Sequence, residues 1–364
     1  MKQILRDFLC PQPKSKIKAG DGQLKGAYNF YTSSQIQSKF YHSATYTQPA
    51  LIFGTGGTAS VHYCNEPFST STDCLVMYGR HDAPLELIYY YLRSNMHLLQ
   101  DGFKGAGLQH ISKDYILNIN IDMPAPSLQK QITHQMRLID AMINGKKQQI
   151  LSFDEAVKSR FIELFGVYPS NPKGWEMATI RDIVADVRYG SSRPAVDGGK
   201  YPYLRMNNIT YGGELDLTDT KRIDIPDNEL DKCTVRRGDV LFNRTNSKEL
   251  VGKTCVYNRD EMMVLAGFVI RVRVTERVLP EFLSAFLNTD FSKQMLLGMC
   301  KAAIGQANIN AQEMQNIGIY LPPTELQRQF VQFKEQTDKS KLAVQKGLQE
   351  LEILKKSLMQ QYFG

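Results

Sequence analysis

The chain has 364 residues, of which 42% are hydrophobic and 22% charged, and its formal net charge is +7. This is an ordinary globular balance, with enough apolar surface for the cores of two domains. The basic excess is too mild for a histone-like protein, and it permits a polyanionic partner without requiring one.

The cysteines and the apolar segments narrow the class further. None of the six cysteines forms a C-x-x-C pair, and the near neighbours His62 and Cys64 fit alternating strand positions better than a zinc site. Scattered cysteines suit a reducing cytoplasm, where we expect the protein to be located. We find no signal peptide and no uncharged apolar run of roughly 18 residues, so no membrane span is expected.

The first predicted domain covers residues 1–123 and contains a basic loop and a glycine turn. The basic loop includes Lys25 and suits phosphate contact, or simply solubility. The glycine turn, residues 53–58, is followed by alternating residues 60–64, which predict a strand. The lax Gly-x-Gly-x-x-Ala pattern in this turn is therefore not a dinucleotide fingerprint, which needs a helix there. We expect the turn to bring the backbone close to a phosphate or base, the alternative being a plain tight turn.

Residues 124–167 are predicted to form the first of two long helices. Ser127 follows two prolines as the predicted N-cap, and apolar residues then recur at three- and four-residue steps. A helix of about 40 residues is roughly 60 Å long. Gly145 here, and Gly347 in the second long helix, weaken the expectation that the helices are continuous.

The second predicted domain, residues 168–321, begins with a linker rich in Pro, Gly and Asn, residues 168–174, and carries polar loops beside its strands. The predicted strands are residues 203–205, 239–242, 254–257 and 268–274. Arg and amide side chains in the adjoining loops suit base edges, and Ser, Thr and Lys suit phosphates. The alternative for each loop is ordinary turn chemistry. The residues predicted to contact DNA in the two domains are Lys25, Gly54, Thr55, Gly56, Gly57, Thr58, Tyr189, Ser191, Ser192, Arg193, Arg205, Asn207, Asn208, Asn243, Arg244, Thr245, Asn246, Ser247 and Lys253.

The second long helix is predicted over residues 322–364, with Thr324 and Gln327 as a capping box. A rod of this length cannot lie wholly against one small domain, so we expect the two helices to pair as an antiparallel coiled coil. The alternative is that each helix packs only on its own domain. The residues predicted for the seam and for subunit docking are Leu128, Ile132, Ile139, Phe153, Val157, Phe330, Val344, Leu348, Leu351 and Leu358.

An internal repeat joins these elements. Residues 107–166 align without a gap to residues 305–364 at a constant offset of 198 positions. Shorter matches lie upstream, such as Leu5-Arg6-Asp7 with Ile180-Arg181-Asp182 and Glu86-Leu87-Ile88 with Glu281-Phe282-Leu283. Between these matches the loops diverge. We therefore predict an α+β fold of two mixed α/β domains separated by two long helices, with a pseudo-two-fold internal repeat.

We find no catalytic motif in the sequence. It lacks the phosphate-binding G-x-x-x-x-G-K-[ST] loop, the Asn/Asp-Pro-Pro-aromatic tetrapeptide, H-E-x-x-H and G-x-S-x-G. We therefore expect neither a catalytic centre nor a metal site.

The chain resembles the specificity subunit of Type I restriction–modification enzymes. The resemblance covers the whole chain and is most specific at Gly174-Trp175-Glu176, at residues 237–242 with Arg244, at the helix start over residues 321–329, and at residues 355–364. The first half differs from this pattern because it lacks an obvious Gly-Trp start.

The resemblance implies a chain that is not an enzyme by itself. Each globular domain would be a target-recognition domain reading one half of a split, asymmetric site in double-stranded DNA. The helices would set the gap and dock two methyltransferase subunits, with restriction subunits in the complete assembly. The partners would use S-adenosylmethionine, and ATP with Mg, whereas this chain would bind no cofactor.

Two other functions remain open from the sequence. The chain could be a non-catalytic coiled-coil scaffold or protein-interaction adaptor, or it could be an enzyme with an unrecognised site. Salt dependence separates DNA binding from apolar docking, because affinity for phosphates falls steeply with salt.

Overall fold

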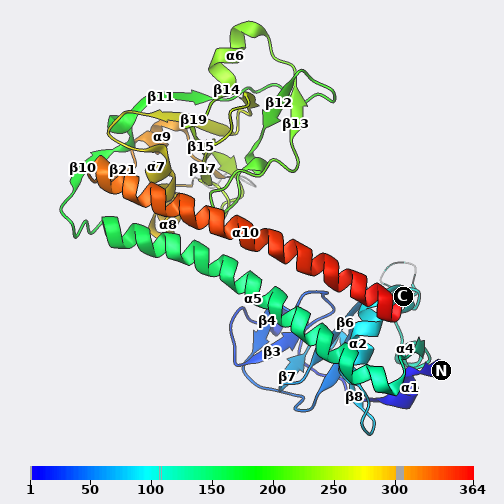
Figure 1. Ribbon diagram of the computed structural model, residues 1–364. Helices are drawn as coiled ribbons and strands as arrows, with labels where there is room; N and C mark the ends of the chain where they lie inside the picture. Colours follow the sequence, from blue (N-terminus) through cyan, green and yellow to red (C-terminus); the bar gives the residue numbers. More distant parts are fainter. Residues whose placement is uncertain (1, 106, 108, 301–306) are drawn as a thin grey trace. The chain divides into compact units, whose positions relative to one another are not determined.

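The computed structural model describes residues 2–105, 107, 109–300 and 307–364, and the chain divides into two compact units (Figure 1). Unit 1 comprises Met1–Gln148 and Val344–Gly364, and unit 2 comprises Gln149–Ala343. The division predicted from the sequence places the boundaries at the helix ends. Packing instead joins a part of each long helix to each globular part.

In its described residues, unit 1 has three sheets and four short α-helices beside its parts of the long helices. The central sheet has the order β2 (Leu9–Pro11), β8 (Cys74–Gly79), β5 (Ala50–Gly54), β6 (Ser60–Cys64) and is antiparallel throughout. A smaller sheet has the order β4 (Lys39–Tyr41), β3 (Tyr28–Tyr31), β7 (Phe68–Thr70), and β1 (Lys2–Ile4) pairs with β9 (Asn120–Asp122). The helices are α1 (Leu5–Phe8), α2 (Leu85–Ser94), α3 (His97–Gln100) and α4 (Lys113–Leu117).

The central strand β5 explains why residues 50–54 form an uninterrupted apolar run. Leu51 and Phe53 point into the core that α2 and the long helices close. Ala50 and Ile52 point into a second core, which lies under β3 and β7. A strand buried on both faces reads as a continuous hydrophobic run instead of an alternating one.

Unit 2 repeats this topology with longer loops. The central sheet has the order β11 (Val184–Tyr189), β19 (Val269–Val274), β15 (Val240–Asn243), β17 (Thr254–Val256). The second sheet has the order β13 (Lys221–Ile223), β12 (Tyr201–Leu204), β18 (Met263–Leu265), β14 (Thr234–Val235). Two strand pairs complete it, β10 (Glu176–Thr179) with β21 (Gly318–Leu321) and β16 (Thr245–Asn246) with β20 (Ala307–Asn308); the helices are α6 (Asp227–Cys233), α7 (Pro280–Leu287), α8 (Asp290–Met299) and α9 (Ala311–Gln315).

The two units share individual hydrogen bonds as well as strand order. In unit 1 Arg6 donates to Asn118 Oδ1 at 3.2 Å, and in unit 2 Arg181 donates to Asn316 Oδ1 at 3.1 Å. The β3–β7 and β12–β18 pairs are both parallel, within sheets that are otherwise antiparallel. The predicted internal repeat and fold class are thus confirmed. The start of the second copy, residues 305–306, lies outside the described residues.

The long helices are α5 (Pro126–Phe165) and α10 (Thr324–Phe363), and they pair antiparallel in each unit. In unit 1 Tyr362 Oη donates to Gln135 Oε1 at 2.7 Å, and Lys355 pairs with Asp140 nearer the middle of α5. In unit 2 the side chain of Lys341 donates to Asp154 Oδ1 at 2.6 Å. Both helices continue through Gly145 and Gly347 without a break.

The same antiparallel contacts continue toward the start of α10. In unit 2 the rings of Phe161 and Phe330 lie 5.3 Å apart in an edge-to-face arrangement. Phe165 also packs on Phe330, at 5.7 Å. At the equivalent positions of unit 1, Ile132 and Phe363 are buried together in the core. The helix pair therefore belongs to the hydrophobic core of each unit.

Most of the predicted seam residues pack as expected, but Leu128 does not. Ile132, Ile139, Phe330 and Val344 are buried, Phe153 is partly buried, Val157 packs on the unit 2 core, and Leu348, Leu351 and Leu358 pack on the unit 1 core. Leu128 is 48% exposed. It lies one turn before Ile132, beyond the last residues of α10, so no partner helix covers it.

Both predicted helix caps were wrong. Helix α5 begins at Pro126, which places Ser127 inside the first turn. Helix α10 begins at Thr324, but the amide of Gln327 does not fold back to it. Gln327 is fully buried and bonds to the backbone of Pro322, Arg277 and Leu279. The side-chain amide of Gln327 therefore bonds to the residues just before α7 and just before α10, and not to the N-terminus of its own helix.

Among the described residues no helix is both long and apolar enough to cross a membrane. The described part of the chain also contains no group of three or more His, Cys, Asp or Glu residues that could hold a metal ion.

Candidate nucleic-acid interface

In unit 2 the polar loops gather at one edge of the central sheet. Strands β11 and β15 end there, at Tyr189 and Asn243, and the antiparallel β19 begins there at Val269. The bridge between Ser191 and Ala266 brings the loop after β11 to the end of the second sheet. We call this the loop edge of unit 2.

The three predicted arginines of the loop edge differ in what they already bind. Arg193 makes two hydrogen bonds to Glu229, and Arg205 pairs with Asp219 at 2.8 Å. Their guanidinium groups are therefore largely satisfied within the protein. Reading a base with either one would first require breaking an ion pair.

Arg244 has no such partner. Among the described residues no carboxylate lies within ion-pair distance, and Nη1 approaches only the carbonyl oxygen of Gly267, at 3.5 Å. The guanidinium carbon stacks 4.7 Å from the ring centroid of Tyr189, whose hydroxyl accepts a hydrogen bond from the backbone of Ala311. Stacking on an aromatic face orients a guanidinium while leaving its N–H donors free. Arg244 is therefore held in place with unused donors.

Several predicted contact residues are instead part of the protein interior. Asn208 is 2% exposed, and its amide binds the backbone of Arg205, Asp216 and Asp219. Asn243 is fully buried. Both positions are corrections to the sequence-based assignment. Asn208 shows that an amide residue after a strand can hold a loop together as readily as it can read a base. The side-chain amide of Asn243 makes no hydrogen bond among the described residues, so burial alone removes it from the surface.

Three more predicted contacts are buried for related reasons. Ser191 accepts a hydrogen bond from the backbone of Arg193, which shapes the turn after β11. Thr245 is 8% exposed because it pairs with β20. Lys253 is 7% exposed, and its ammonium donates to the carbonyl oxygen of Met206 at 3.0 Å. Burial lowers the pKa of Lys253.

The other predicted residues of the loop edge are accessible. Ser192, Asn207 and Ser247 are exposed, Asn246 is partly exposed, and Tyr189 is 37% exposed. Sequence reasoning missed Phe268, which is 51% exposed in the turn before β19. The available signal was the pair Gly267-Phe268 directly before the predicted strand, but this pair equally well predicts the beginning of the strand itself.

In unit 1 the predicted glycine turn occupies the equivalent edge. Gly54 and Thr55 are buried, Gly56 is partly exposed, and Gly57 and Thr58 are exposed, as is Lys25 in its own loop. A Cβ atom on Gly54 would lie 2.8 Å from Cα of Ser33. Gly54 is thus needed for close packing inside the protein, which corrects its assignment as a DNA contact.

Thr55 and Arg244 occupy equivalent positions in the backbone framework of strands that the two units share, each directly after the second inner strand of the central sheet. Thr55 N donates to Asp73 O, and its carbonyl accepts from Ile111 N. Arg244 N donates to Phe268 O, and its carbonyl accepts from Ile309 N, at the position equivalent to Ile111. The hydroxyl of Thr55 donates to Asp73 O at 2.9 Å, so the assignment of Thr55 as a DNA contact is corrected as well. One frame therefore presents a free guanidinium in unit 2 and a buried threonine in unit 1.

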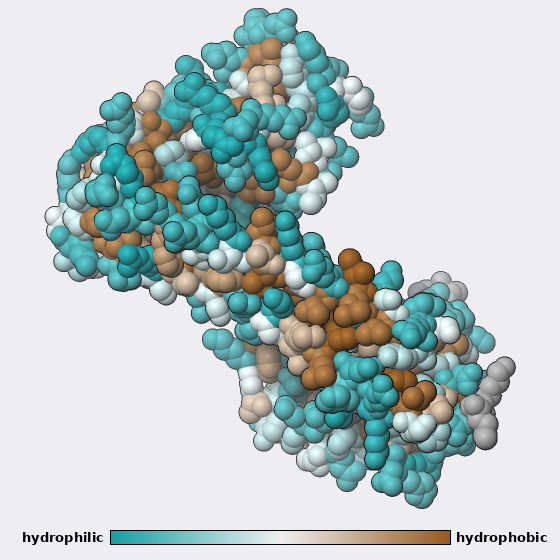
Figure 2. All heavy atoms as spheres, in the orientation of Figure 1, coloured by the Kyte–Doolittle hydropathy of each residue, from teal (hydrophilic) through white to brown (hydrophobic). Residues whose placement is uncertain are grey.

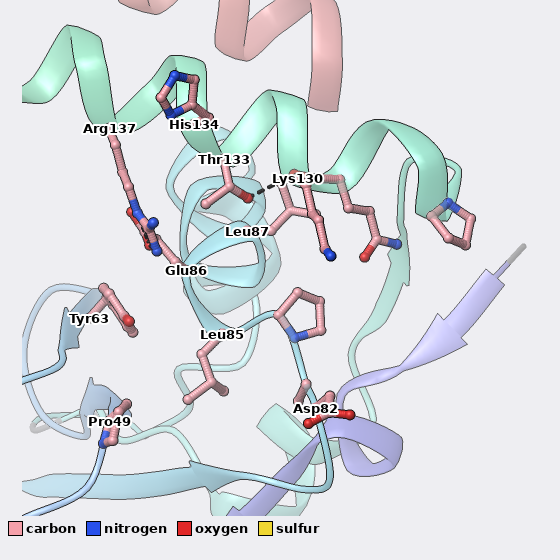
Figure 3. Close-up of a pocket in the computed structure, with 14 residues that line it drawn as sticks. Pro49, Tyr63, Asp82, Leu85, Glu86, Leu87, Lys130, Thr133, His134 and Arg137 are labelled. Carbon is pink, nitrogen blue, oxygen red and sulfur yellow. Dashed lines mark hydrogen bonds and ion pairs between the residues drawn. The ribbon is translucent and has the colours of Figure 1, made fainter.

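Unit 1 also contains a pocket of about 700 Å³ between α2 and α5 (Figure 3). Lys130 and Arg137 of α5 extend toward the start of α2, where Arg137 pairs with Glu86. A second pocket, of about 510 Å³, lies in unit 2 beside α5 and α10.

The pocket of unit 1 lies where the two units connect a long helix to a short one differently. In unit 2 the amide oxygen of Gln327 accepts from Leu279 N at 2.8 Å and joins the start of α10 to that of α7. At the equivalent positions of unit 1 stand Gln129 and Pro84. Gln129 keeps the bond to Pro124 O, but proline has no N–H to complete the bridge. The hydrogen bond that connects α10 to the start of α7 in unit 2 therefore has no counterpart between α5 and α2 of unit 1, where the pocket lies.

The chain matches the family model described as Type I restriction modification DNA specificity domain over residues 7–152 and 172–353. It is 24% identical over 248 residues to the type I restriction enzyme EcoKI specificity subunit of Escherichia coli strain K12, covering 64% of this chain and 53% of that protein. It is 27% identical over 196 residues to the putative type I restriction enzyme MjaX specificity subunit of Methanocaldococcus jannaschii, covering 53% and 46%. The chain spans about half the length of these curated relatives.

Two solved structures share the fold. The S subunit of a Type-I restriction-modification system from M. genitalium gives a TM-score of 0.62 at 13% identity and covers 100% of this chain and 96% of that chain. A chain from a structure on complex assembly and conformational transition of the type I R-M system gives 0.56 at 16% identity, covering 100% and 97%. The family model matches both halves and most of the sequence, and the chain therefore belongs to the Type I restriction–modification DNA specificity family.

Proposed function

We propose that this chain is the DNA specificity subunit of a Type I restriction–modification system. Unit 1 reads one half of a bipartite, asymmetric site in double-stranded DNA, and unit 2 reads the other half. The chain supplies recognition and performs no catalysis itself. The observation that carries this proposal is the shared frame with different side chains at the same position, a free Arg244 in one unit and a bonded Thr55 in the other.

Arg244 has the chemistry for sequence readout in unit 2. A guanidinium with free donors forms bidentate hydrogen bonds to O6 and N7 of guanine in the major groove. The stack on Tyr189 limits the guanidinium's freedom before binding, so less side-chain entropy is lost on contact. Ser192, Asn207 and Ser247 lie exposed on the same loop edge and suit phosphates or further base edges.

The helices of unit 1 support the proposed partner. Leu138 and Met142 of α5 are 50% and 48% exposed, and Ile353 and Leu354 of α10 are 69% and 46% exposed. Figure 2 shows apolar side chains gathered on a face of unit 1. Exposed apolar patches of this kind mark protein contacts. We assign this face to a methyltransferase subunit, with two such subunits in the assembly and restriction subunits joining it.

The cofactors of the assembly belong to the partners in this proposal. The methyltransferase subunits bring S-adenosylmethionine, and the restriction subunits bring ATP with Mg. This chain binds neither.

The test is to co-express the full chain with its methyltransferase subunit in a host that lacks adenine and cytosine methylation, and then to sequence the methylated positions. We expect two short specific blocks with a constant gap between them. Methylation without a bipartite motif, together with gel-shift binding that is equal for all duplexes, would falsify the proposal.

The salt dependence of binding separates this function from a scaffold. If the complex neutralises several phosphates, the logarithm of its affinity for DNA falls linearly with the logarithm of salt concentration, with a slope of about −0.9 per phosphate. A scaffold that docks through apolar surface would show only a weak dependence. A flat salt profile would therefore favour the scaffold.

A further inference from the structure

The turn that joins β3 to β4 in unit 1 presents a large apolar side chain to solvent. It spans residues 32–38, and Ile36 near its middle is 73% exposed. An isoleucine left in solvent forgoes the stabilisation that burial of its apolar side chain would give. We call residues 32–38 the β3–β4 turn.

Side chains of the β3–β4 turn fasten it to the edge of the central sheet. Ser33 Oγ donates to the carbonyl oxygen of Asp73 at 2.9 Å. Gln35 Nε2 donates to the carbonyl oxygen of Ala59 at 3.1 Å. Both acceptors lie in loops at the edge that carries the glycine turn, so Ile36 sits on a fixed support.

Side chains of β6 hold the backbone of the turn as well. Ser60 Oγ donates to the carbonyl oxygen of Ser33 at 3.1 Å, and His62 Nε2 lies 2.8 Å from the carbonyl oxygen of Ser34. Gly54 lets the backbone of Ser33 approach closely, as its missing Cβ would lie 2.8 Å from Cα of Ser33. Two side chains of β6 and the glycine at the end of β5 thus hold this turn against the sheet.

Unit 2 fastens its equivalent loop in the same way with a different side chain. The loop after β12 corresponds to the β3–β4 turn, and Lys253 donates to the carbonyl oxygen of Met206 at 3.0 Å. By strand register, Lys253 corresponds to Ser60 and Met206 to Ser33. The next residue in unit 2, Asn207, is exposed. Each unit therefore anchors this loop to the sheet and leaves a side chain near the anchor free.

We propose, on the basis of the proposed function, that the β3–β4 turn is a DNA-reading element of unit 1 and that Ile36 makes an apolar contact with the bases. Two apolar features of DNA suit it. One is the 5-methyl group of thymine in the major groove, and the other is the face of a base at an opened step. A side chain on a rigid support discriminates better than one on a mobile loop, because less freedom is lost on contact.

The surroundings of the turn favour nucleic acid over protein as its partner. A Cβ atom on Gly57 would meet nothing within 4 Å, so the neighbouring glycine turn is open to close approach. Gln23 pairs with Phe40 of β4, which places exposed Lys25 beside the same hairpin. An open glycine backbone and a basic residue beside an apolar tip suit a polyanion with apolar base edges.

The test compares Ile36→Ser with Leu24→Ser in the full chain, each co-expressed with the methyltransferase subunit. Leu24 is 86% exposed in the same unit but lies outside the fastened turn. We expect Ile36→Ser to relax one position in one half of the methylated motif, with the other half and the assembly unchanged. Ile36→Val should keep the motif, and Leu24→Ser should leave it intact.

Duplexes of the identified motif then distinguish the two apolar contacts. If Ile36 touches a thymine methyl group, replacing that thymine by uracil lowers wild-type affinity about fourfold, the value of one methyl-sized group, and has no effect on Ile36→Ser. If Ile36 enters an opened base step, uracil has no effect, and Ile36→Ser reduces the bend of the bound duplex. Either result supports the proposal.

Three results overturn it. An unchanged motif in Ile36→Ser, with a bipartite motif in the wild type, removes the turn from recognition and leaves the proposed function standing. Loss of methylation together with lost binding of the methyltransferase subunit in Ile36→Ser makes Ile36 a protein contact. Absence of any bipartite motif in the wild type refutes the proposed function first, and this inference with it.

Discussion

At the scale of residues, partners decide which polar side chains are available to DNA. Arg193 and Arg205 lie in loops as suitable as that of Arg244, yet each is bound to a carboxylate. Lys253 has the charge to bind a phosphate but is buried against a carbonyl group. A residue's type states what it can bind, whereas its neighbours state whether that capacity is already used.

Arg244→Ala should relax specificity at one position of one half-site. A lost bidentate base contact costs roughly 1–3 kcal/mol of discrimination, equivalent to about 5- to 150-fold. The measurement is the methylated motif together with competition binding between cognate duplexes and those mutated at single positions. Arg193→Ala is the matched control, since its guanidinium is already bound to Glu229. Equal loss of discrimination in both variants would contradict the role assigned to Arg244.

Gly190→Ala should destabilise unit 2. A Cβ atom there would lie 2.2 Å from Leu265 O and 2.4 Å from Ala266 O, and backbone atoms cannot move aside cheaply. We expect a loss of about 1–3 kcal/mol, measured by chemical denaturation. The control is Gly145→Ala in α5, where a Cβ atom meets nothing within 4 Å and the helix should gain about 0.5–1 kcal/mol. A neutral Gly190→Ala would show that the close approach after β11 is not required.

At the scale of elements, the long helices are parts of the two cores. The buried Ile132 and Phe363 are the unit 1 counterparts of Phe330 and Phe165. Helix pairing and domain folding are therefore coupled within each unit. This coupling explains why a helix with many charged residues can stay ordered over 40 residues.

Leu351→Asp should weaken unit 1 and its binding to the methyltransferase subunit. Leu351 is partly buried and packs on the unit 1 core, so Leu351→Asp would place a carboxylate against apolar side chains. We expect a stability loss of about 1–3 kcal/mol, read from denaturant unfolding. The control Ile353→Asp changes a side chain that is 69% exposed and should leave the unfolding midpoint nearly unchanged. An equal shift of the unfolding midpoint in the two variants would mean that Leu351 contributes no seam packing.

The triad of Lys341, Asp154 and Glu214 predicts a pH effect on unit 2. Burial acts to lower the pKa of Lys341, but its hydrogen bonds to the two carboxylates prevail and raise it above 10.5. Since the folded pKa exceeds the unfolded one, the stabilisation is complete below pH 10.5 and is lost as pH rises through the folded value. Wild-type stability should thus fall more steeply in this alkaline range than that of Lys341→Met. Parallel profiles would contradict the prediction.

At the scale of the whole molecule, the two copies of the duplicated module share their strand framework and differ in their loops. Both units keep the same strand order in the central sheet and the same backbone bonds at Thr55 and Arg244. The loops on this frame differ in length and in side chains. A duplicated frame with different loops reads two unlike half-sites, so the proposed target is asymmetric.

The two half-sites should relax independently. Ile36 and Arg244 belong to different compact units and share no hydrogen-bond partner among the described residues, so their effects on discrimination should add within about 0.5 kcal/mol. The double variant Ile36→Ser with Arg244→Ala tests this in competition binding. Strong non-additivity would mean that the two units do not read DNA separately.

The internal repeat, the two long helices and the fold class could all be predicted from the sequence, because periodicity and self-similarity are local signals that survive in the order of residues. The strand over residues 60–64 also excluded a nucleotide fold, and the structure has β6 there. The capping box predicted for α10 was wrong because the side-chain amide of Gln327 bonds to Leu279 and Arg277, just before α7 and far away in the sequence.

By itself the sequence determined that this protein is a duplicated module with a helix in each copy, and it named polar loops as the variable part. Only the tertiary structure decided which loop residues are free. It removed Asn208, Asn243 and Lys253 from the candidates by burial, kept Arg244, and brought Ile36 forward on a fastened turn. The physical reason is that a side chain's availability depends on contacts between segments that are distant in the sequence, which no local pattern records.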